Sequence, residues 1–153
     1  MKFITMGCIF LLMAVLVVSG CSAPDDGQKE VSELARDLGI DVVSTSFDDF
    51  GAIFCDPNSS SENISILVDE EYKGNFVQWT GIVYAITDNG RSYTVQVKHC
   101  QDSLTDAAVT FNINENEAVS KLIKGQEVTY LGRVTRYQNG VGFWVEEAYL
   151  VPE

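Results

Sequence analysis

The cysteines are the residues of this 153-residue chain whose type and position most clearly suggest chemistry. There are four of them, Cys8, Cys21, Cys55 and Cys100. A thiol can be acylated, oxidised to a disulfide or bound to a metal ion, depending on its surroundings. Because His99 is the single histidine, the sequence gives little support for histidine-based catalysis or a histidine-rich metal site. Lipid attachment and disulfide formation are therefore the reactions that the cysteines suggest.

Cys21 follows a segment that is typical of a secretory signal peptide. Lys2 supplies a basic start, and residues 9–18 are all apolar. Val18-Ser19-Gly20-Cys21 then resembles the lipobox of prokaryotic lipoproteins, in which the cysteine is lipidated and becomes the first residue. The alternative is an apolar helix that is not cleaved and anchors the chain in a membrane.

The lipobox interpretation predicts a signal peptide over residues 1–20, and a lipidated cysteine with a polar tether over residues 21–30. Two or more acyl chains anchor a protein stably, whereas one is marginal. The folded part would then lie at the extracytoplasmic face of the cell membrane, where thiols can oxidise. A Cys55–Cys100 disulfide would close a loop of about 46 residues and stabilise the fold by about 4 kcal/mol. Two buried free thiols are the alternative.

Charge divides the chain unevenly. The net charge of −12 argues against a protein that coats nucleic acid, because such proteins neutralise phosphates with clustered Lys and Arg. Residues 22–74 carry 13 acidic and three basic side chains, whereas residues 75–153 carry nine acidic and six basic ones. The residue pattern changes near the same boundary, which predicts a helical lead-in over residues 31–71 and a domain over residues 72–153.

The lead-in has the apolar spacing of helices. The spacing predicts three short helices, over residues 31–38, between Ser46 and Pro57, and over residues 61–72. Whether they pack on the second domain stays open. Their predicted inward-facing residues are Val31, Leu34, Ala35 and Leu38; Phe47, Phe50, Ile53 and Phe54; and Ile64, Leu67 and Val68.

The second domain has the alternating pattern of strands. Its predicted order is strand, strand, strand, helix, strand, strand, and Asp88-Asn89-Gly90 is a strong signal for the first hairpin. The helix is predicted to bury Ala118, Val119, Leu122 and Ile123. The predicted strands cover residues 77–83, 91–99, 107–113, 127–137 and 142–151, and the helix covers residues 115–124.

The first and fourth of these strands match each other. Val77-x-Trp79-x-Gly81-x-Val83 has the same pattern as Val128-x-Tyr130-x-Gly132-x-Val134. A glycine within a strand marks a bulge or a tight bend, and two strands bent at matching places suit a small, strongly coiled barrel. The sequence therefore predicts a mainly β fold, a five-stranded OB-fold barrel (β-β-β-α-β-β) with a short N-terminal helical segment and with Trp79 and Tyr130 in its core.

Several short motifs carry a resemblance to a known family. They are Tyr72-Lys73-Gly74, Val77-x-Trp79-Thr80-Gly81-x-Val83, and Lys124-Gly125-Gln126-x-Val128 leading into Gly132-x-Val134. On these residues, the part of the chain from 72 to 151 resembles the tRNA-anticodon-binding-like OB-fold family of extracytoplasmic prokaryotic proteins. Phe47-Asp48-Asp49-Phe50 and Phe54-Cys55-Asp56-Pro57-Asn58 resemble the helical lead-in of some members. The resemblance implies the fold, and no residue matches a catalytic motif.

OB-folds bind ligands on the outer face of their second and third strands and on the flanking loops. The aromatic side chains at these positions suit stacking, but the basic side chains are few for a phosphate backbone. For Trp144 the alternative is that the N-terminal helices cover it. The predicted ligand-binding face comprises Tyr84, Arg91, Thr94, Gln96, Lys98, Arg133, Tyr137 and Trp144.

Together these features predict a membrane-tethered, extracytoplasmic binding or scaffold module. Its partners are predicted to be the membrane, through a lipid on Cys21, and an envelope protein or glycan. Binding of single-stranded nucleic acid by the barrel face is the alternative. An enzyme is not predicted, since the chain has no Ser-His-Asp set and no glycine-rich phosphate loop. No cofactor or metal site is predicted, because Asp48-Asp49 and Asp69-Glu70-Glu71 lack the ligand spacing of an EF-hand.

Overall fold

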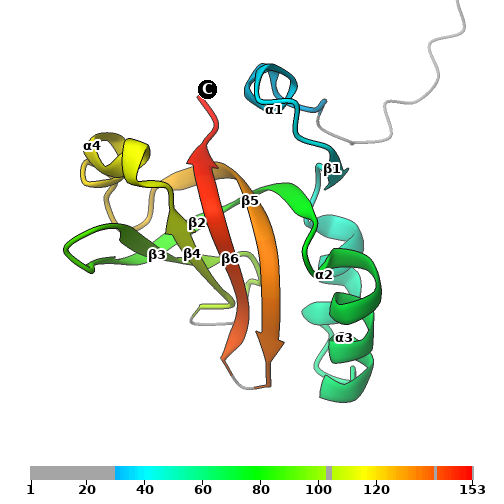
Figure 1. The fold of residues 1–153 in the computed structure, drawn as a ribbon. Coiled ribbons are helices and arrows are strands. Elements are labelled where there is room, and N and C mark those ends of the chain that lie inside the picture. Colours follow the sequence, from blue (N-terminus) through cyan, green and yellow to red (C-terminus); the bar gives the residue numbers. More distant parts are fainter. Residues whose placement is uncertain (1–29, 103–104, 140, 153) are drawn as a thin grey trace, which may run out of the picture.

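Five strands close into a barrel in the computed structural model, which describes residues 30–102, 105–139 and 141–152. The strands pair in the order β2-β3-β4-β6-β5, and β5 pairs with β2 to complete the barrel (Figure 1). The predicted mainly β OB-fold is confirmed. The predicted signal peptide and Cys21 lie outside the described residues. The barrel strands are β2 (Phe76–Asp88), β3 (Tyr93–Lys98), β4 (Ala107–Phe111), β5 (Glu127–Gln138) and β6 (Gly142–Leu150).

A sixth strand, β1 (Val42–Ser44), was not predicted. It pairs in parallel with the start of β2. Three residues are too few for an alternating pattern to be visible in the sequence. The indole Nε1 of Trp79 donates a hydrogen bond to the Ser44 hydroxyl at 2.9 Å, so β1 also ties the lead-in to a buried barrel side chain.

The lead-in forms the three predicted helices, each shorter than expected. They are α1 (Glu33–Asp37), α2 (Asp48–Phe54) and α3 (Ser61–Leu67), and a π-helical turn over Val68–Tyr72 continues α3. Ser32 and Ser60 cap α1 and α3 by accepting hydrogen bonds from backbone N–H groups. Two of the predicted inward positions are wrong, because Leu38 and Ile53 are exposed where α1 and α2 face solvent.

Helix α2 closes one end of the barrel with aromatic side chains. The ring of Phe47 lies 5.1 Å from that of Trp79, and the ring of Phe50 lies 5.3 Å from it. Phe54 packs against Phe143 at 5.5 Å. Burying one such side chain contributes roughly 1.5–3 kcal/mol relative to leaving it exposed. The lead-in therefore packs on the barrel and completes its core.

The opposite end of the barrel is closed by a 3-10 turn, Ile113–Glu115, and by α4 (Asn116–Val119), whose Val119 is fully buried (Figure 1). The predicted helix over residues 115–124 is therefore too long. The Ser120 hydroxyl donates a hydrogen bond to the Glu117 carbonyl at 2.9 Å, a local bond that competes with helix continuation.

The segment after α4 turns toward β5 instead of continuing as a helix. Gly125 adopts a φ of 89°, which L-residues rarely adopt, and its N–H bonds to Val83 in β2. Ala118 and Ile123 are consequently exposed, contrary to prediction, while Leu122 packs partly against the core.

The two matched glycines lie where no side chain would fit. A Cβ atom on Gly81 would lie 2.5 Å from the Val97 side chain, and one on Gly132 would overlap the Val145 side chain. The register of β5 against β6 shifts between Leu131 and Arg133, but the extra residue lies in β6, where Glu147 has a φ of 52°, so the bulge predicted at Gly132 is carried by the partner strand. On β2 the register against β3 shifts between Val83 and Ala85. The irregularity therefore lies after Gly81 and not at the glycine, where it was predicted.

Candidate ligand-binding face

Outward-facing side chains of four barrel strands form one continuous row. Gln96 of β3 lies opposite Ala108 of β4, Ala108 lies opposite Trp144 of β6, and Trp144 lies opposite Arg136 of β5. Neighbouring strands are about 4.8 Å apart, so the row spans roughly 14 Å. We refer to Gln96, Ala108, Trp144 and Arg136 as the Trp144 row.

Trp144 and Arg136 form one end of this row. The guanidinium carbon of Arg136 lies 4.0 Å from the centre of the Trp144 ring. Such a cation–π contact contributes about 0.5–1 kcal/mol at an exposed site. Trp144 is half-buried and alternates along β6 with the buried Phe143 and Val145, and the α2 rings pack on Phe143.

Two cations, Arg136 in the row and Lys98 beside it, have no ion-pair partner among the described residues. Within the described residues, neither Arg136 nor Lys98 takes part in an ion pair, whereas Lys73, Lys121 and Arg133 each do. Lys98 lies two positions from Gln96 on β3 and therefore on the same side of the strand. These two positive charges are available to an anionic ligand.

Hydroxyl groups border the row on the other side of Gln96. Thr94 lies opposite Thr110 of β4, and their hydroxyls are 3.1 Å apart. The amide of Asn89 donates to the Thr94 hydroxyl at 2.9 Å. The structure thus brings together four of the eight predicted face residues, namely Thr94, Gln96, Lys98 and Trp144.

The other four predicted face residues lie elsewhere or are engaged. Arg133 is ion-paired with Glu147 at 2.7 Å. The ring of Tyr84 lies 4.5 Å from the Lys124 ammonium group, outside the row. Arg91 lies in the loop between β2 and β3. The fourth, Tyr137, lies at the end of the barrel that α2 closes. The eight residues therefore do not form a single surface, because bulges in β2 and β5 and closure of the barrel direct them apart.

A buried polar cluster lies at that same end of the barrel and was not predicted. The Nδ1 atom of His99 lies 2.7 Å from the Asp106 carboxylate, and its Nε2 atom lies 3.1 Å from the Tyr130 hydroxyl. The His99 and Asp106 side chains are only 1% and 2% exposed. The imidazole also stacks on the Phe47 ring at 4.3 Å. The single sequence signal was a lone histidine beside a cysteine, which does not identify its partners.

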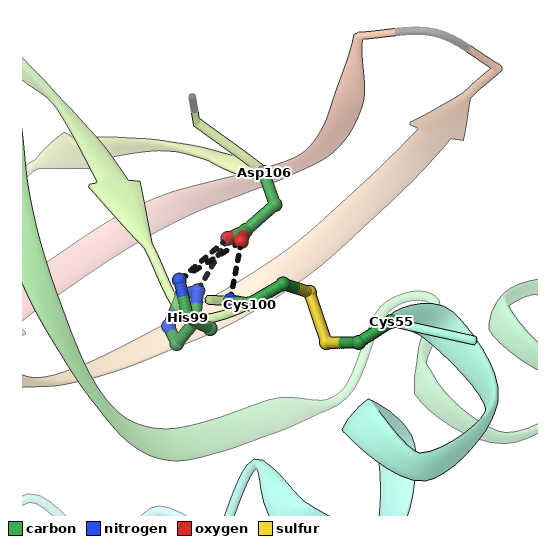
Figure 2. The surroundings of a disulfide bond; sticks show 4 residues. All are labelled: Cys55, His99, Cys100 and Asp106. Atoms are coloured by element: carbon green, nitrogen blue, oxygen red, sulfur yellow. Dashed lines mark hydrogen bonds and ion pairs between the residues drawn. A yellow bond between two sulfur atoms is a disulfide. The ribbon is translucent and has the colours of Figure 1, made fainter. Parts of the chain in front are cut away.

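Asp106 is held as a buried carboxylate by several donors. The backbone N–H groups of His99 and Cys100 each donate to it at 2.8 Å (Figure 2). Burial raises the pKa of Asp106, but the hydrogen bond and charge of His99 and the backbone donors outweigh it, so the pKa lies below its ordinary value of 3.8. Burial, together with the nearby Asp106 charge, holds the pKa of Tyr130 well above 10.0. The cluster is therefore a fixed structural element that presents no exposed reactive group.

A disulfide joins α2 to the segment that follows β3. Cys55, just beyond α2, is bonded to Cys100, with their Cα atoms 5.6 Å apart (Figure 2). Of the two alternatives for these thiols, the structure contains the bonded one. Since Cys100 also donates its backbone N–H to Asp106, the disulfide and the buried cluster hold the same segment.

A cavity of about 650 Å³ opens beside the disulfide, and we refer to it as the α2 cavity. The rings of Phe54 and Tyr137, 6.0 Å apart, form part of its wall. Burial raises the pKa of the Tyr137 hydroxyl. Tyr137 therefore faces a different site from the Trp144 row.

Neither a metal-binding cluster nor a membrane-spanning helix is found in the part of the chain that the structure describes. In that part, no group of three or more His, Cys, Asp or Glu side chains is arranged to hold a metal ion. No helix among residues 30–102, 105–139 and 141–152 combines the length and apolar character needed to cross a membrane.

Comparison with known proteins supports the fold. The sequence model of the tRNA_anti-like family matches residues 1–145, while no match is found among curated proteins. A lipoprotein from Klebsiella pneumoniae subsp. pneumoniae, provisionally designated nucleic acid-binding, is 22% identical to this chain. The match covers 80% of this chain and 100% of that chain, with a TM-score of 0.50. At this identity, the likeness shows the fold alone.

Two more distant structures also match about half of this chain. An asparaginyl-tRNA synthetase from Pyrococcus horikoshii is 21% identical over 53% of this chain, with a TM-score of 0.41. A chain of the S. pombe Stn1–Ten1 complex is 15% identical over 51% of this chain, with a TM-score of 0.39. The matches span 20% of the synthetase chain and 59% of the S. pombe chain.

Proposed function

The chain belongs to the tRNA_anti-like family, and from that premise we propose that it is a membrane-tethered, extracytoplasmic OB-fold module that binds an anionic glycan of the cell envelope. The observation that carries the proposal is the Trp144 row. It presents an outward indole ring under an unpaired arginine, in register with the Gln96 amide.

The chemistry of the row suits a charged sugar polymer. An apolar sugar face can pack on the Trp144 ring, which offers a large rigid contact with little loss of side-chain entropy. The Gln96 amide both donates and accepts hydrogen bonds, as sugar hydroxyls require. Arg136 can bind a carboxylate with two parallel hydrogen bonds, and Lys98 adds a second positive charge.

Three observations support the proposed location. The lipobox-like Val18-Ser19-Gly20-Cys21 predicts lipid attachment. The Cys55–Cys100 disulfide is of the kind that persists in oxidising compartments. The Klebsiella pneumoniae protein with the same fold is itself named as a lipoprotein.

Lipid attachment can be tested by metabolic labelling with a radioactive fatty acid. We expect label in the parent protein and none in Cys21→Ser. Cys8→Ser is the matched control, because it removes a thiol from the predicted signal peptide and should retain the label. Label that survives in Cys21→Ser would contradict the proposed anchor.

Binding of single-stranded nucleic acid is the second candidate. It is favoured by the designation of the Klebsiella pneumoniae protein, and because the Trp144 ring could stack on a base. A strand would also need a continuous basic track, whereas Lys98 and Arg136 stand at opposite ends of the row. Glu146 and Glu147 lie on the same strand as Trp144, and the chain carries a net charge of −12. These acidic charges repel any polyanion, so the wide separation of Lys98 and Arg136 is what favours a glycan with spaced carboxylates over a continuous phosphate backbone.

The two candidates are separated by binding assays on the full chain in nonionic detergent. Purified cell-wall sacculi serve as the glycan probe in co-sedimentation, and an oligothymidylate serves as the nucleic-acid probe in fluorescence anisotropy. We expect binding to sacculi that weakens about tenfold in Trp144→Ala and falls with salt. Tyr84→Ala is the matched control, since it removes another aromatic–cation pair outside the row. Salt-sensitive oligothymidylate binding without sacculus binding would instead support the nucleic-acid candidate.

A further inference from the structure

The α2 cavity is built as a binding site, although nothing in the proposed function uses it. Its volume of about 650 Å³ lies within the range of roughly 300–1,000 Å³ that is typical of ligand sites. It lies between α2, the segment after β3 and the connection between β5 and β6. It therefore opens at the end of the barrel and not on the face that carries the Trp144 row.

Aromatic rings form the apolar walls of the cavity. Phe47, Phe54 and Tyr137 all line it. The planes of the Phe54 and Tyr137 rings are nearly perpendicular, at 83° to each other, and both side chains are only half-buried. A ring arranged in this way presents part of its electron-rich face to an entering group, and such faces attract cations.

Acidic side chains form the polar part of the lining. Asp48 and Asp102 line the cavity and are exposed to solvent. Asp48 accepts a hydrogen bond from the Ser46 hydroxyl at 2.8 Å, and among the described residues neither carboxylate is ion-paired with a lysine or arginine. The described lining contains no lysine or arginine, and the one imidazole, His99, is held by Asp106. The cavity is therefore negatively charged and complementary to a cation.

The walls of the cavity are fixed before any ligand enters. The Cys55–Cys100 disulfide joins the end of α2 to the segment after β3 (Figure 2), and both cysteines line the cavity. Asp106 holds the segment after β3 through the backbone N–H groups of His99 and Cys100. A preformed site loses little conformational entropy on binding, which favours affinity for a small group.

From these contacts we propose that the α2 cavity binds the ammonium or guanidinium group of a lysine or arginine side chain on a partner polypeptide. The side-chain stem packs on the aromatic walls, and the charged group lies at Asp48 and Asp102. Val141, 47% exposed, lies in the lining and offers an apolar contact to the residue beside the basic one. Residues 22–74, which include the lead-in, carry 13 acidic and three basic side chains, and this charge steers a basic segment toward this end.

The test is calorimetric titration of the full chain in nonionic detergent with two short peptides. One has a single lysine followed by leucine in a glycine background, and the other has glutamine in place of lysine. We expect the lysine peptide to bind at least about tenfold more tightly. Equal affinities for the two peptides would overturn the proposal. Spermidine serves as a third probe. If spermidine binds as tightly as the lysine peptide, the identification of the partner as a polypeptide is overturned.

Matched variants locate the interaction. Asp102→Asn should weaken binding of the lysine peptide about fivefold, since it removes one exposed carboxylate of the lining. Asp37→Asn removes the same charge from α1, outside the lining, and should change affinity less than about twofold. Equal losses in both variants would show only a general effect of charge and would overturn the site. Trp144→Ala should leave peptide binding unchanged, so failure of this proposal is distinguishable from failure of the glycan proposal.

Discussion

The barrel end closed by α2 and the Trp144 row use similar residue types in opposite arrangements. At the closed end, a histidine, an aspartate and aromatic rings satisfy one another, with the Asp106 carboxylate bonded to His99 and to two backbone N–H groups. In the row, the Arg136 guanidinium packs on the half-buried Trp144 ring, and Arg136 has no carboxylate partner within the described residues.

This difference separates stability from binding in the molecule. Buried polar groups that are fully bonded are costly to disturb, because removing one partner leaves the others unsatisfied. Exposed cation–π pairs contribute little to the free energy of unfolding, yet they keep a cation and a ring available to a ligand. The two regions should therefore respond very differently to substitution.

The largest effect is expected at the buried carboxylate. Asp106→Ala leaves the His99 imidazole and two backbone N–H groups without their acceptor, so we expect the free energy of unfolding to fall by about 4 kcal/mol. Urea unfolding followed by tryptophan fluorescence measures it. Asp102→Ala, at an exposed carboxylate nearby, should cost less than about 0.5 kcal/mol. A loss below about 1 kcal/mol for Asp106→Ala would show that the cluster does not hold the closed end.

Removing the disulfide is expected to have the next largest effect. The double substitution Cys55→Ser and Cys100→Ser should lower the free energy of unfolding by about 3–4 kcal/mol, mainly because the unfolded chain is no longer cross-linked. The same urea titration gives the value. A reducing agent should destabilise the parent protein to a similar extent and leave the variant unaffected. If the reducing agent does not change the free energy of unfolding of the parent protein, the disulfide does not stabilise the fold as proposed.

A smaller effect is expected from protonating Asp106. Its pKa is lower in the folded protein than its ordinary value of 3.8, so its contribution to stability is fully present above that pH. The contribution is lost as the pH falls from about 3.8 through the lower folded-state pKa. Urea midpoints measured down this range should fall more steeply for the parent than for Asp106→Asn. Parallel profiles would show that Asp106 is not stabilised as a carboxylate.

The smallest effect on stability is expected in the Trp144 row. Trp144→Ala should cost about 2 kcal/mol or less, since Trp144 is half-buried and the substitution removes one cation–π contact. Its neighbour Phe143 points into the core and is 1% exposed, so Phe143→Ala should cost about 3–5 kcal/mol. Urea unfolding of the pair tests the contrast directly, and equal losses would place Trp144 in the core and not on a ligand surface.

Local patterns in the sequence predicted the barrel well. The alternation from Val77 onward and the Asp88-Asn89-Gly90 turn reflect the pleat of a strand and the backbone of a tight hairpin, which neighbouring residues determine. The same local rules failed for β1, which is too short to show a period. They also failed beyond Val119, where a Ser120 side-chain bond ends the helix early.

The candidate sites depend on long-range placement, which the sequence pattern does not show. Alternation correctly placed Thr94, Gln96 and Lys98 on one side of β3. It did not show that Trp144 lies two strands away from them or that Arg136 covers it, because the parallel pairing of β4 with β6 and a bulge in β5 determine those neighbours. The His99–Asp106 contact likewise depends on burial beneath α2.

The most direct test of the Trp144 row as the ligand surface is nuclear magnetic resonance mapping of the full chain in detergent micelles. Cell-wall glycan solubilised from sacculi is titrated into the labelled protein. We predict that the largest shifts occur at the backbone amides of Gln96 and Ala108 and at the indole N–H of Trp144, and that they disappear in Arg136→Ala. Shifts centred on Tyr84, or on the α2 cavity with the row unchanged, would contradict the assignment of the row as the ligand surface.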